Sequence, residues 1–477
     1  MGRNEAKNEK NQTCTIMKAT LLHKATIVTS EKEATGSVLI IDGKIEDILY
    51  AETENFDYLI YNIRNKYSDI EVIDLEGKWL MAGGIDAHVH FREPGLTHKA
   101  DMETESLAAV AGGVTSVIDM PNTSPATTSA ENLEAKLKLA EGRVAANIGF
   151  NIGATNENHQ DICNMLDGKS CVKPEHVGGV KVFMGSSTGN MLVDSGSALE
   201  EFFNIKSRPV LVHCEDEATI KANLEKAVQN YGEDIPFTEH ENIRSRMACI
   251  KSSIKALEMA IKNDTRLVLC HISTKEEMEM VRAAKLNNPN IVAETSCNYL
   301  WFTNEDYARL GSRVKCNPAV KTSADRDALR KGLAEGLIDT IGSDHAPHLL
   351  TEKDAKYCKA PSGLPSIQQS LPVLLTIADM EEIPLTQIAS VFSEITGEIY
   401  GLNRGKVHAG YAADLVIFDK NKEFTVNAED QMSKCGWTPY EGTVLKGYIE
   451  LVFVNGEKVI ENGKPTGVKS GTLLNFN

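Results

Sequence analysis

Residues 84–120 read GIDAHVHFREPGLTHKADMETESLAAVAGGVTSVIDM and contain the pattern that decides the fold. Two short runs rich in β-branched residues, 85–90 and 114–120, lie on either side of a longer stretch that is not strand-like. Six further runs continue this alternation at 147–154, 179–184, 209–214, 266–273, 291–297 and 340–345. Strands that alternate with helices are typical of parallel sheets, and eight such units in about 250–300 residues predict a TIM-like (β/α)8 barrel.

One of the intervening stretches, residues 247–262, has a clear helical period. Its apolar residues recur at spacings of three and four: Met247, Ile250, Ile254, Leu257 and Ile261. This spacing predicts an α-helix that carries these five side chains on one face.

Both ends of the chain have strand patterns, at 25–30, 36–49 and 71–81 before the barrel and at 413–419, 423–427 and 442–463 after it. Neither end has enough strands to bury both faces of a sheet alone. We therefore expect a small β-sandwich formed by the N- and C-terminal segments. The predicted domains are a polar, disordered tail at 1–16, the first part of the sandwich at 17–83, the barrel at 84–405 and the second part of the sandwich at 406–477.

Charge and cysteine usage narrow the class of protein. Fifty basic and 67 acidic residues give a net charge of −17, which argues against nucleic acid or an anionic membrane as a partner. A small anionic substrate needs only a local basic clamp and stays possible. The ten cysteines are scattered, the N-terminus has no apolar signal region, and no apolar stretch reaches membrane-spanning length. These features predict a cytoplasmic protein.

Histidines and one aspartate stand at or near the ends of the predicted strands. His88 and His90 are two residues apart and share one strand face, whereas His213, His271 and Asp344 end three later strands. The carboxyl ends of barrel strands face one mouth, so these five side chains should gather there. Imidazoles and carboxylates are the ligands of zinc. Since the chain has only 12 histidines, a metal site is favoured over a coincidence of structural histidines.

Lys181 lies inside the predicted strand GGVKVFMG. A lysine in a barrel strand is costly unless it is paired or chemically altered. It could extend outward between helices, or its amine could be carboxylated by carbon dioxide and bridge two cations. The residues alone leave both possibilities open.

Longer blocks around these residues resemble the cyclic amidohydrolases, and within them the dihydroorotase family, from about Lys18 to Lys464. The blocks are GGIDAHVHFREPG, AAVAGGVTSVIDMPNTSPAT, VHCED, GSDHAPH, APSGLPS and HAGYAADLVIFD. The resemblance implies two zinc ions per chain, one held by His88, His90 and Asp344 and the other by His213 and His271. A carbamate on Lys181, derived from carbon dioxide, would bridge them. One branch of the family bridges with an aspartate in an S-D-D-G block, but Ser186–Gly189 contains no acid, which favours Lys181.

The resemblance also assigns the substrate's contacts. A guanidinium suits bidentate capture of a carboxylate, and Arg92 follows the two histidines, so we expect it to bind the substrate's carboxylate together with Asn122 and His348. Asn317 should contact the pyrimidine ring. The alternatives are an Arg92–Glu93 ion pair, a turn asparagine and a loop histidine.

The predicted activity is the reversible hydrolysis of dihydroorotate to N-carbamoyl-L-aspartate, a step of de novo pyrimidine biosynthesis. Asp344 would take the proton from the attacking water and deliver it to the leaving nitrogen. An allantoinase or a hydantoinase-like (dihydropyrimidinase-like) cyclic amidase is the rival within the same chemistry, and a non-catalytic scaffold is the rival of another class. The resemblance further implies a homodimer or homotetramer.

Overall fold

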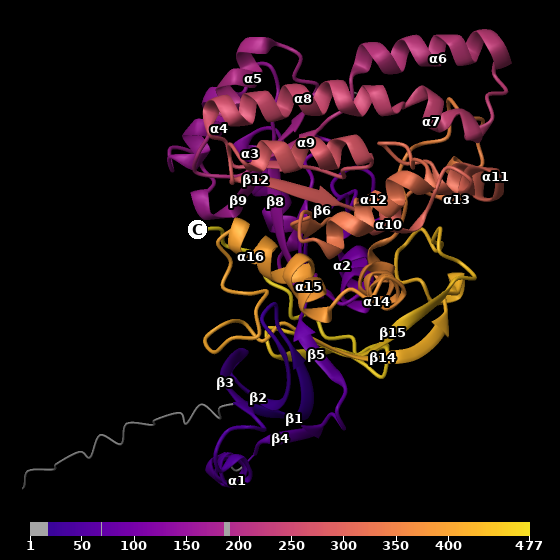
Figure 1. Ribbon diagram of the computed structural model, residues 1–477. Helices are drawn as coiled ribbons and strands as arrows, with labels where there is room; N and C mark the ends of the chain where they lie inside the picture. The colour runs from indigo at the N-terminus through magenta and orange to yellow at the C-terminus, as the bar shows by residue number, and fades with distance from the viewer. Residues whose placement is uncertain (1–17, 68, 186–190) are drawn as a thin grey trace, which may run out of the picture.

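The computed structural model describes residues 18–67, 69–185 and 191–477. The tail predicted at 1–16 and the Ser186–Gly189 block lie outside the described residues. Figure 1 shows the barrel with its surrounding helices above a sheet that both ends of the chain build.

Eight strands form a parallel sheet whose order follows the chain from β6 to β13. Their bounds are β6 Gly84–Val89, β7 Val114–Asp119, β8 Asn147–Gly153, β9 Val177–Phe183, β10 Val210–His213, β11 Leu267–Leu269, β12 Ile291–Thr295 and β13 Thr340–Ile341. The sheet closes where Val89 bridges His345, just after β13, and the N–H of His90 donates to the His345 carbonyl at 2.8 Å. The predicted TIM-like barrel is confirmed.

Helices follow the strands and cover the outside of the barrel (Figure 1). The longer ones are α2 Met102–Ala111, α3 Ala130–Ala140, α4 His159–Leu166, α5 Gly196–Phe203, α6 Glu217–Tyr231, α8 Arg246–Asn263, α9 Lys275–Lys285, α12 Ser323–Ala334 and α14 Ser370–Met380. Shorter ones are α7 His240–Ile243, α10 Cys297–Trp301, α11 Asp306–Leu310, α13 Leu350–Lys353, α15 Leu385–Ala389 and α16 Ile395–Ile399. Within the described part of the chain, no helix is both long and apolar enough to cross a membrane.

The predicted helix at 247–262 corresponds to α8, but its large apolar residues are not its main buried face. Met247, Ile254 and Ile261 are exposed. The helix instead buries small residues, namely Ala248, Cys249, Ser252, Ser253, Ala256 and Ala260, together with Leu257. Small side chains let α8 approach its neighbours closely, so the spacing of the large residues did not identify the packed face.

A second sheet combines both ends of the chain in the order β17-β16-β15-β14-β5-β1-β2-β3, with β4 paired to β1. Its strands are β1 Ala19–Val28, β2 Glu33–Ile41, β3 Lys44–Tyr50, β4 Glu71–Asp74, β5 Trp79–Ala82, β14 Leu415–Thr425, β15 Val444–Val454, β16 Glu457–Glu461 and β17 Lys464–Pro465. The two ends meet where β5 and β14 pair antiparallel, with Ala82 opposite Leu415. Residues 51–69 contribute helix α1, Phe56–Lys66, whose Ile60 packs on the β1–β3 part of this sheet.

Candidate metal centre

All ten residues predicted for the site line one cavity of about 250 Å³. They are His88, His90, Lys181, His213, His271 and Asp344, predicted as metal ligands, and Arg92, Asn122, Asn317 and His348, predicted to contact the substrate. Residues from six of the eight barrel strands, or from the loops directly after them, therefore meet at the carboxyl ends of those strands, as the barrel geometry requires.

Backbone conformation aims several of these side chains into the cavity. Lys181 and His213 lie within β9 and β10, whereas three other residues leave their strands in the left-handed region, with φ of 65° at Arg92, 40° at His271 and 49° at Asp344. A non-glycine residue in this region costs about 1–2 kcal/mol. Strain of this kind is typical of residues that a functional site holds in place.

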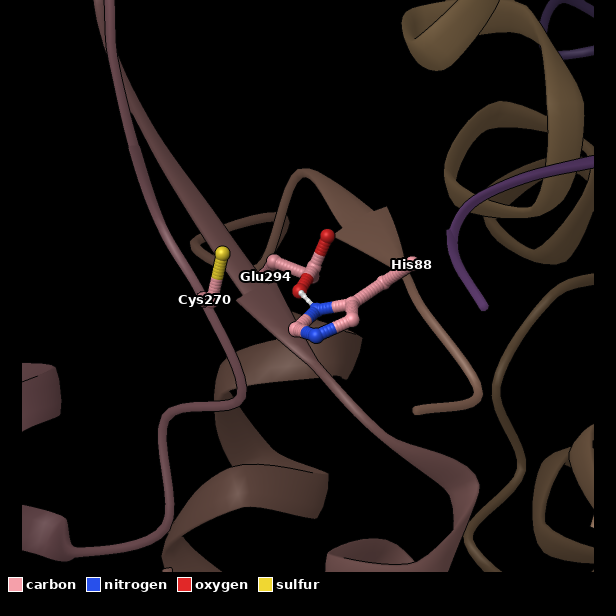
Figure 2. A group of neighbouring side chains, drawn as sticks. All are labelled: His88, Cys270 and Glu294. Atoms are coloured by element: carbon pink, nitrogen blue, oxygen red, sulfur yellow. Dashed lines mark hydrogen bonds and ion pairs between the residues drawn. The ribbon is translucent and has the colours of Figure 1, made fainter. Parts of the chain in front are cut away.

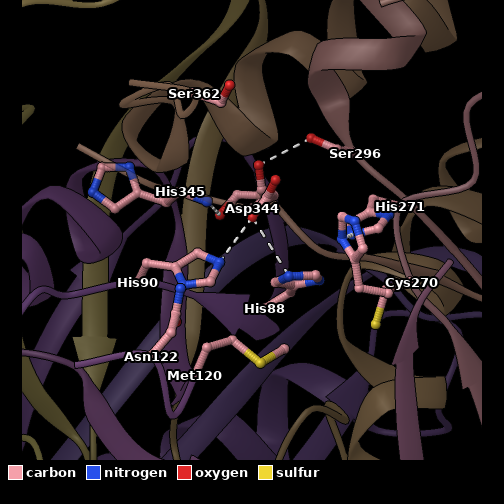
Figure 3. Close-up of polar contacts among 12 residues, drawn as sticks. His88, His90, Met120, Asn122, Cys270, His271, Ser296, Asp344, His345 and Ser362 are labelled. Atoms are coloured by element: carbon pink, nitrogen blue, oxygen red, sulfur yellow. Dashed lines mark hydrogen bonds and ion pairs between the residues drawn. The ribbon is translucent and has the colours of Figure 1, made fainter. Parts of the chain in front are cut away.

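His88, His90 and Asp344 form one candidate cation site (Figure 3). Asp344 Oδ1 lies 3.0 Å from His90 Nε2 and 3.4 Å from His88 Nε2. The ligand atoms of all three residues lie within 4.8 Å of one another. Two imidazole nitrogens and a carboxylate oxygen in such proximity suit a divalent cation such as zinc.

His213 and His271 form the neighbouring pair. His213 Nδ1 lies 2.9 Å from His271 Nε2, and the two ring centroids are 4.7 Å apart. The His271 ring is also 5.3 Å from the His88 ring, centroid to centroid, so the two groups adjoin. His271 Nδ1 is buried without a hydrogen-bond partner among the described residues. The donor set thus fits a second cation beside the first.

Three side chains fix the orientation of the histidine rings. Glu294 Oε1 lies 2.6 Å from His88 Nδ1 (Figure 2), and Glu215 Oε2 lies 3.0 Å from His213 Nε2. Asn122 Oδ1 accepts from His90 Nδ1 at 2.6 Å. A ring that donates through one nitrogen directs the lone pair of the other towards the cavity, which is the usual arrangement around a metal ligand.

Sequence reasoning missed Glu294 and Glu215. Both are buried carboxylates next to apolar strand residues, in IVAET and VHCED. A charged residue inside an apolar strand was the signal that singled out Lys181. The same signal would have found Glu294, which lies within β12, but not Glu215, which lies two residues after the end of β10.

Burial sets the protonation of the site. It lowers the pKa of His88 and of His271, and neighbouring positive charges lower both further. Neutral imidazole is the form that binds metals. Burial alone would raise the pKa of Asp344, but the hydrogen bond to His90 and the charges of His88 and His90 hold that pKa below its ordinary value.

Lys181 points inward, which excludes the outward alternative. Its side chain is 1% exposed, and its Nζ lies 3.3 Å from Cys270 Sγ. In the described residues no carboxylate pairs with it. A buried amine with only a weak sulfur acceptor is the environment in which chemical modification of the amine would remove the cost of burial. His88, Cys270 and Glu294 also lie within 4.8 Å of one another (Figure 2), but Glu294 already accepts from His88 there.

Arg92 lies on the opposite wall of the cavity. It is buried, and its Nε donates to the Pro347 carbonyl at 3.1 Å. The expected alternative, an ion pair with Glu93, is wrong because Glu93 pairs with Arg143 at 3.0 Å and accepts from the N–H of Met102. Arg92 Nη2 lies 3.1 Å from His348 Nε2, so the guanidinium and this imidazole form one surface of the cavity.

His348 and Asn317 are also placed for contact with a ligand. Lys99 Nζ lies 3.1 Å from His348 Nδ1 and can donate to it, while His348 Nε2 can donate to the Ser362 carbonyl at 3.1 Å. Burial and the charges of Arg92 and Lys99 hold the pKa of His348 well below its ordinary value, so this ring is neutral.

Asn317 Oδ1 is buried and has no hydrogen-bond partner in the described chain. Phe183, Ala346 and residues 361–363 line the cavity as well. Of these, residues 361–363 belong to the APSGLPS block of the sequence, for which no individual role was predicted.

Comparison with known proteins identifies the family to which the chain is similar. The amidohydrolase family matches residues 79–459. A dihydroorotase of Methanosarcina acetivorans is 36% identical over 383 residues, which cover 78% of this chain and 79% of that protein. A dihydroorotase of Staphylococcus epidermidis is 32% identical over 404 residues, which cover 83% and 91%.

Solved structures with the same fold carry other names. The L-hydantoinase (dihydropyrimidinase) from Arthrobacter aurescens superposes with a TM-score of 0.87 at 26% identity, over 96% of this chain and 99% of that one. The dihydropyrimidinase from Brevibacillus agri gives 0.84 at 22% identity, over 97% and 99%. The second likeness concerns the fold alone.

Proposed function

The chain belongs to the amidohydrolase family and is a metal-dependent hydrolase of cyclic amides, and on that premise we propose that its substrate is dihydroorotate. The observation that carries this choice is the buried Arg92, which forms no ion pair in the described chain and lines the same cavity as the candidate metal ligands. Dihydroorotate carries a carboxylate on its ring, whereas hydantoin and dihydrouracil do not. A buried guanidinium is stabilised by a ligand carboxylate and gains nothing comparable from a neutral ring.

In this proposal His88, His90 and Asp344 would hold one zinc ion, His213 and His271 would hold a second, and Lys181 would carry the carbamate that serves as their common ligand. Bound zinc would supply Lewis acidity for the amide carbonyl and lower the pKa of water to about 7. The neutral imidazoles, the low pKa of the Asp344 carboxyl and the inward amine of Lys181 support this assignment.

Asp344 is the residue that moves the proton. The oxygen of the attacking water adds to the ring carbonyl, and its proton goes to the Asp344 carboxylate. The bond between the carbonyl carbon and the ring nitrogen then breaks, and Asp344 returns the proton to that nitrogen. The product is N-carbamoyl-L-aspartate, and each step runs backwards for ring closure.

Arg92, His348, Asn122 and Asn317 position the ring. Arg92 can make two parallel hydrogen bonds to a carboxylate. Asn122 lines the cavity, and its Oδ1 accepts from His90 Nδ1 at 2.6 Å, so this side chain lies between the candidate metal ligands and the bound ring in this proposal. Holding the ring in one orientation lowers the barrier by removing the entropy cost of alignment.

A second candidate substrate class is supported by one observation, the likeness to the L-hydantoinase structure. Purified protein assayed on dihydroorotate, dihydrouracil, hydantoin and allantoin separates the candidates. We expect turnover of dihydroorotate to exceed that of each neutral ring by at least about 100-fold in kcat/KM, as expected when a buried charged site lacks its partner. A preference for hydantoin or dihydrouracil would refute the proposal. The zinc content per chain tests the scaffold alternative, which expects none.

The homodimer or homotetramer, which depends on the resemblance alone, and the cytoplasmic location, which depends on the cysteine pattern and the apolar pattern of the sequence, are parts of the same proposal. Native mass spectrometry tests the first and fractionation of the cells that make the protein tests the second.

A further inference from the structure

Lys353, the last residue of α13, lies directly behind the cavity. Its side chain is 0% exposed, and its Nζ donates to the carbonyls of Lys315 at 3.1 Å, Pro361 at 2.9 Å and Gly363 at 3.0 Å. Three carbonyl oxygens satisfy the three N–H bonds of the ammonium group. Its charge, however, has no carboxylate partner among the residues that the structure describes.

The carbonyls that Lys353 holds belong to the cavity wall. Pro361, Ser362 and Gly363 line the cavity beside Arg92 and His348. The Ser362 carbonyl lies 3.1 Å from His348 Nε2. The backbone of residues 361–363 therefore lies between the ammonium group and the part of the cavity where we place the substrate's carboxylate.

This wall carries more positive than negative charge. Arg92, Lys99 and Lys353 surround the neutral ring of His348, and the acid that pairs with them in the described structure is Glu352, 2.9 Å from Lys99. Burial, together with the nearby charges of Lys315 and Arg92, lowers the pKa of Lys353 to about 7. A ligand carboxylate would supply the missing negative charge and stabilise the ammonium form.

We propose that Lys353 is a specificity-determining residue, whose buried charge favours cyclic amides that carry a carboxylate over neutral ones. The inference rests on the proposed function and deepens it, because it places the discrimination in the wall behind Arg92 as well as in Arg92 itself. Lys353 does not touch the ligand. Its ammonium group makes the electrostatic potential in the pocket more positive, and its hydrogen bonds hold residues 361–363 in position.

Lys315 is a matched control for the structural part of this role. It is also a buried lysine, and its Nζ donates to the Tyr357 carbonyl at 2.7 Å and the Ala360 carbonyl at 2.6 Å in the same loop. The ammonium group lies 4.2 Å from the Tyr357 ring centroid. Neither Tyr357 nor Ala360 lines the cavity. Loss of the Lys315 amine should disturb the loop while leaving Lys353 and its ammonium group in place.

The experiment measures affinity for two ligands, orotate and its methyl ester, which has the same ring but no negative charge on the carboxyl group, by calorimetry on the zinc-loaded protein. Lys353→Met keeps the length of the side chain and removes the charge, and Lys353→Gln keeps N–H donors for the carbonyls. We expect both variants to lose at least about tenfold in affinity for orotate, with a change of less than about threefold for methyl orotate. Lys315→Met should change the two affinities by the same factor.

Equal losses for orotate and methyl orotate in the Lys353 variants would overturn the proposal, as would a failure of both variants to fold, which would assign Lys353 a structural role alone. Turnover of dihydroorotate by the unmodified enzyme is measured in parallel. If that turnover is absent while the orotate preference still depends on Lys353, the proposed function fails and the inference stands. If turnover is present and the preference is unchanged, the inference fails alone.

Discussion

The two walls of the cavity differ in the groups that hold their side chains in place. The candidate metal ligands form the metal-side wall, and Arg92, His348 and residues 361–363, with Lys353 behind them, form the substrate-side wall. The metal-side wall is carried largely by barrel strands, and its histidines are hydrogen-bonded to Glu294, Glu215 and Asn122. The substrate-side wall is carried by the loops after β6 and β13. Its cations Arg92 and Lys353 rest against backbone carbonyls.

The difference shows how one small cavity can hold two kinds of ligand. Carboxylate and amide partners fix neutral imidazoles in the tautomer that a cation needs. Carbonyl partners satisfy the N–H groups of a cation but leave its charge uncompensated, so the wall keeps an affinity for anions. The metal-side wall should therefore control turnover, and the substrate-side wall should control which rings are accepted.

The largest expected effect comes from Asp344, which is both a candidate metal ligand on the metal-side wall and the proposed proton acceptor. Asp344→Asn removes the proton acceptor while keeping the size of the side chain. We expect kcat on dihydroorotate to fall by about 10³-fold or more, with the fold and much of the zinc retained. Steady-state kinetics and zinc analysis on the same preparation test this, and an active Asp344→Asn enzyme would contradict the assigned role.

On the substrate-side wall, Arg92→Ala should act on substrate choice. Loss of a charged, two-bond contact costs about 2–4 kcal/mol, or a factor of roughly 30 to 10³ in kcat/KM for dihydroorotate. Neutral cyclic amides should be affected by less than about threefold, because they have no carboxylate to place there. Parallel assays on dihydroorotate and dihydrouracil measure the difference, and equal losses on both would remove the distinction between the walls.

The orienting acids provide a smaller test of the metal-side wall. Glu294→Gln and Glu215→Gln should each weaken zinc binding by about 10- to 100-fold, the usual cost of losing a partner of a ligating histidine. Glu105→Gln is the matched control, because Glu105 Oε2 lies 2.7 Å from the buried His345, which lies outside the predicted ligand set. Zinc release to a competing chelator should separate the variants, and an equal effect in Glu105→Gln would point to a general loss of stability.

The sequence predicted the barrel and the ligands at its strand ends because both depend on local periodicity, whereas the roles of Lys181, Arg92, Asn122, Asn317 and His348 came from the resemblance. Apolar runs show where strands end, and a barrel brings all the carboxyl ends of its strands to one mouth. The sequence alone therefore predicted that His213, His271 and Asp344 lie together. The burial of α8 could not be predicted in this way, because its packed face is formed by small residues that carry little hydrophobic signal.

The contacts that hold the site residues in place could not be predicted from the sequence either. The pairing of Lys353 with Pro361 and Gly363, or of Glu294 with His88, joins residues whose relative positions are set only by tertiary packing. Charged residues in apolar surroundings mark such partners as candidates but do not say which groups they meet. The chemical roles assigned to the cavity residues stay predictions until the variants are measured.

The smallest effect expected is a pH dependence of stability that only the substrate-side wall should produce. The pKa of Lys353 is about 7 in the folded protein against an ordinary value of 10.5. Between these two pH values the unfolded chain binds the proton and the folded protein does not, so the free energy of unfolding rises with pH through this window. Below pH 7 both states are protonated, and the folded state bears the full cost of the buried charge.

Lys353→Gln lacks this titration. The stability of the unmodified protein relative to Lys353→Gln should therefore increase from pH 7 to pH 9, by up to about 1 kcal/mol for each pH unit. Urea unfolding of both proteins at the two pH values measures the difference, and other titrating groups cancel because the two chains share them. Lys315, whose pKa burial lowers to about 8, gives the same sign in a narrower window, so Lys315→Gln is the control. A difference that is flat with pH would mean that the three carbonyls stabilise the buried ammonium group of Lys353 as well as water does, which would remove the contrast in charge compensation from which the two walls were distinguished.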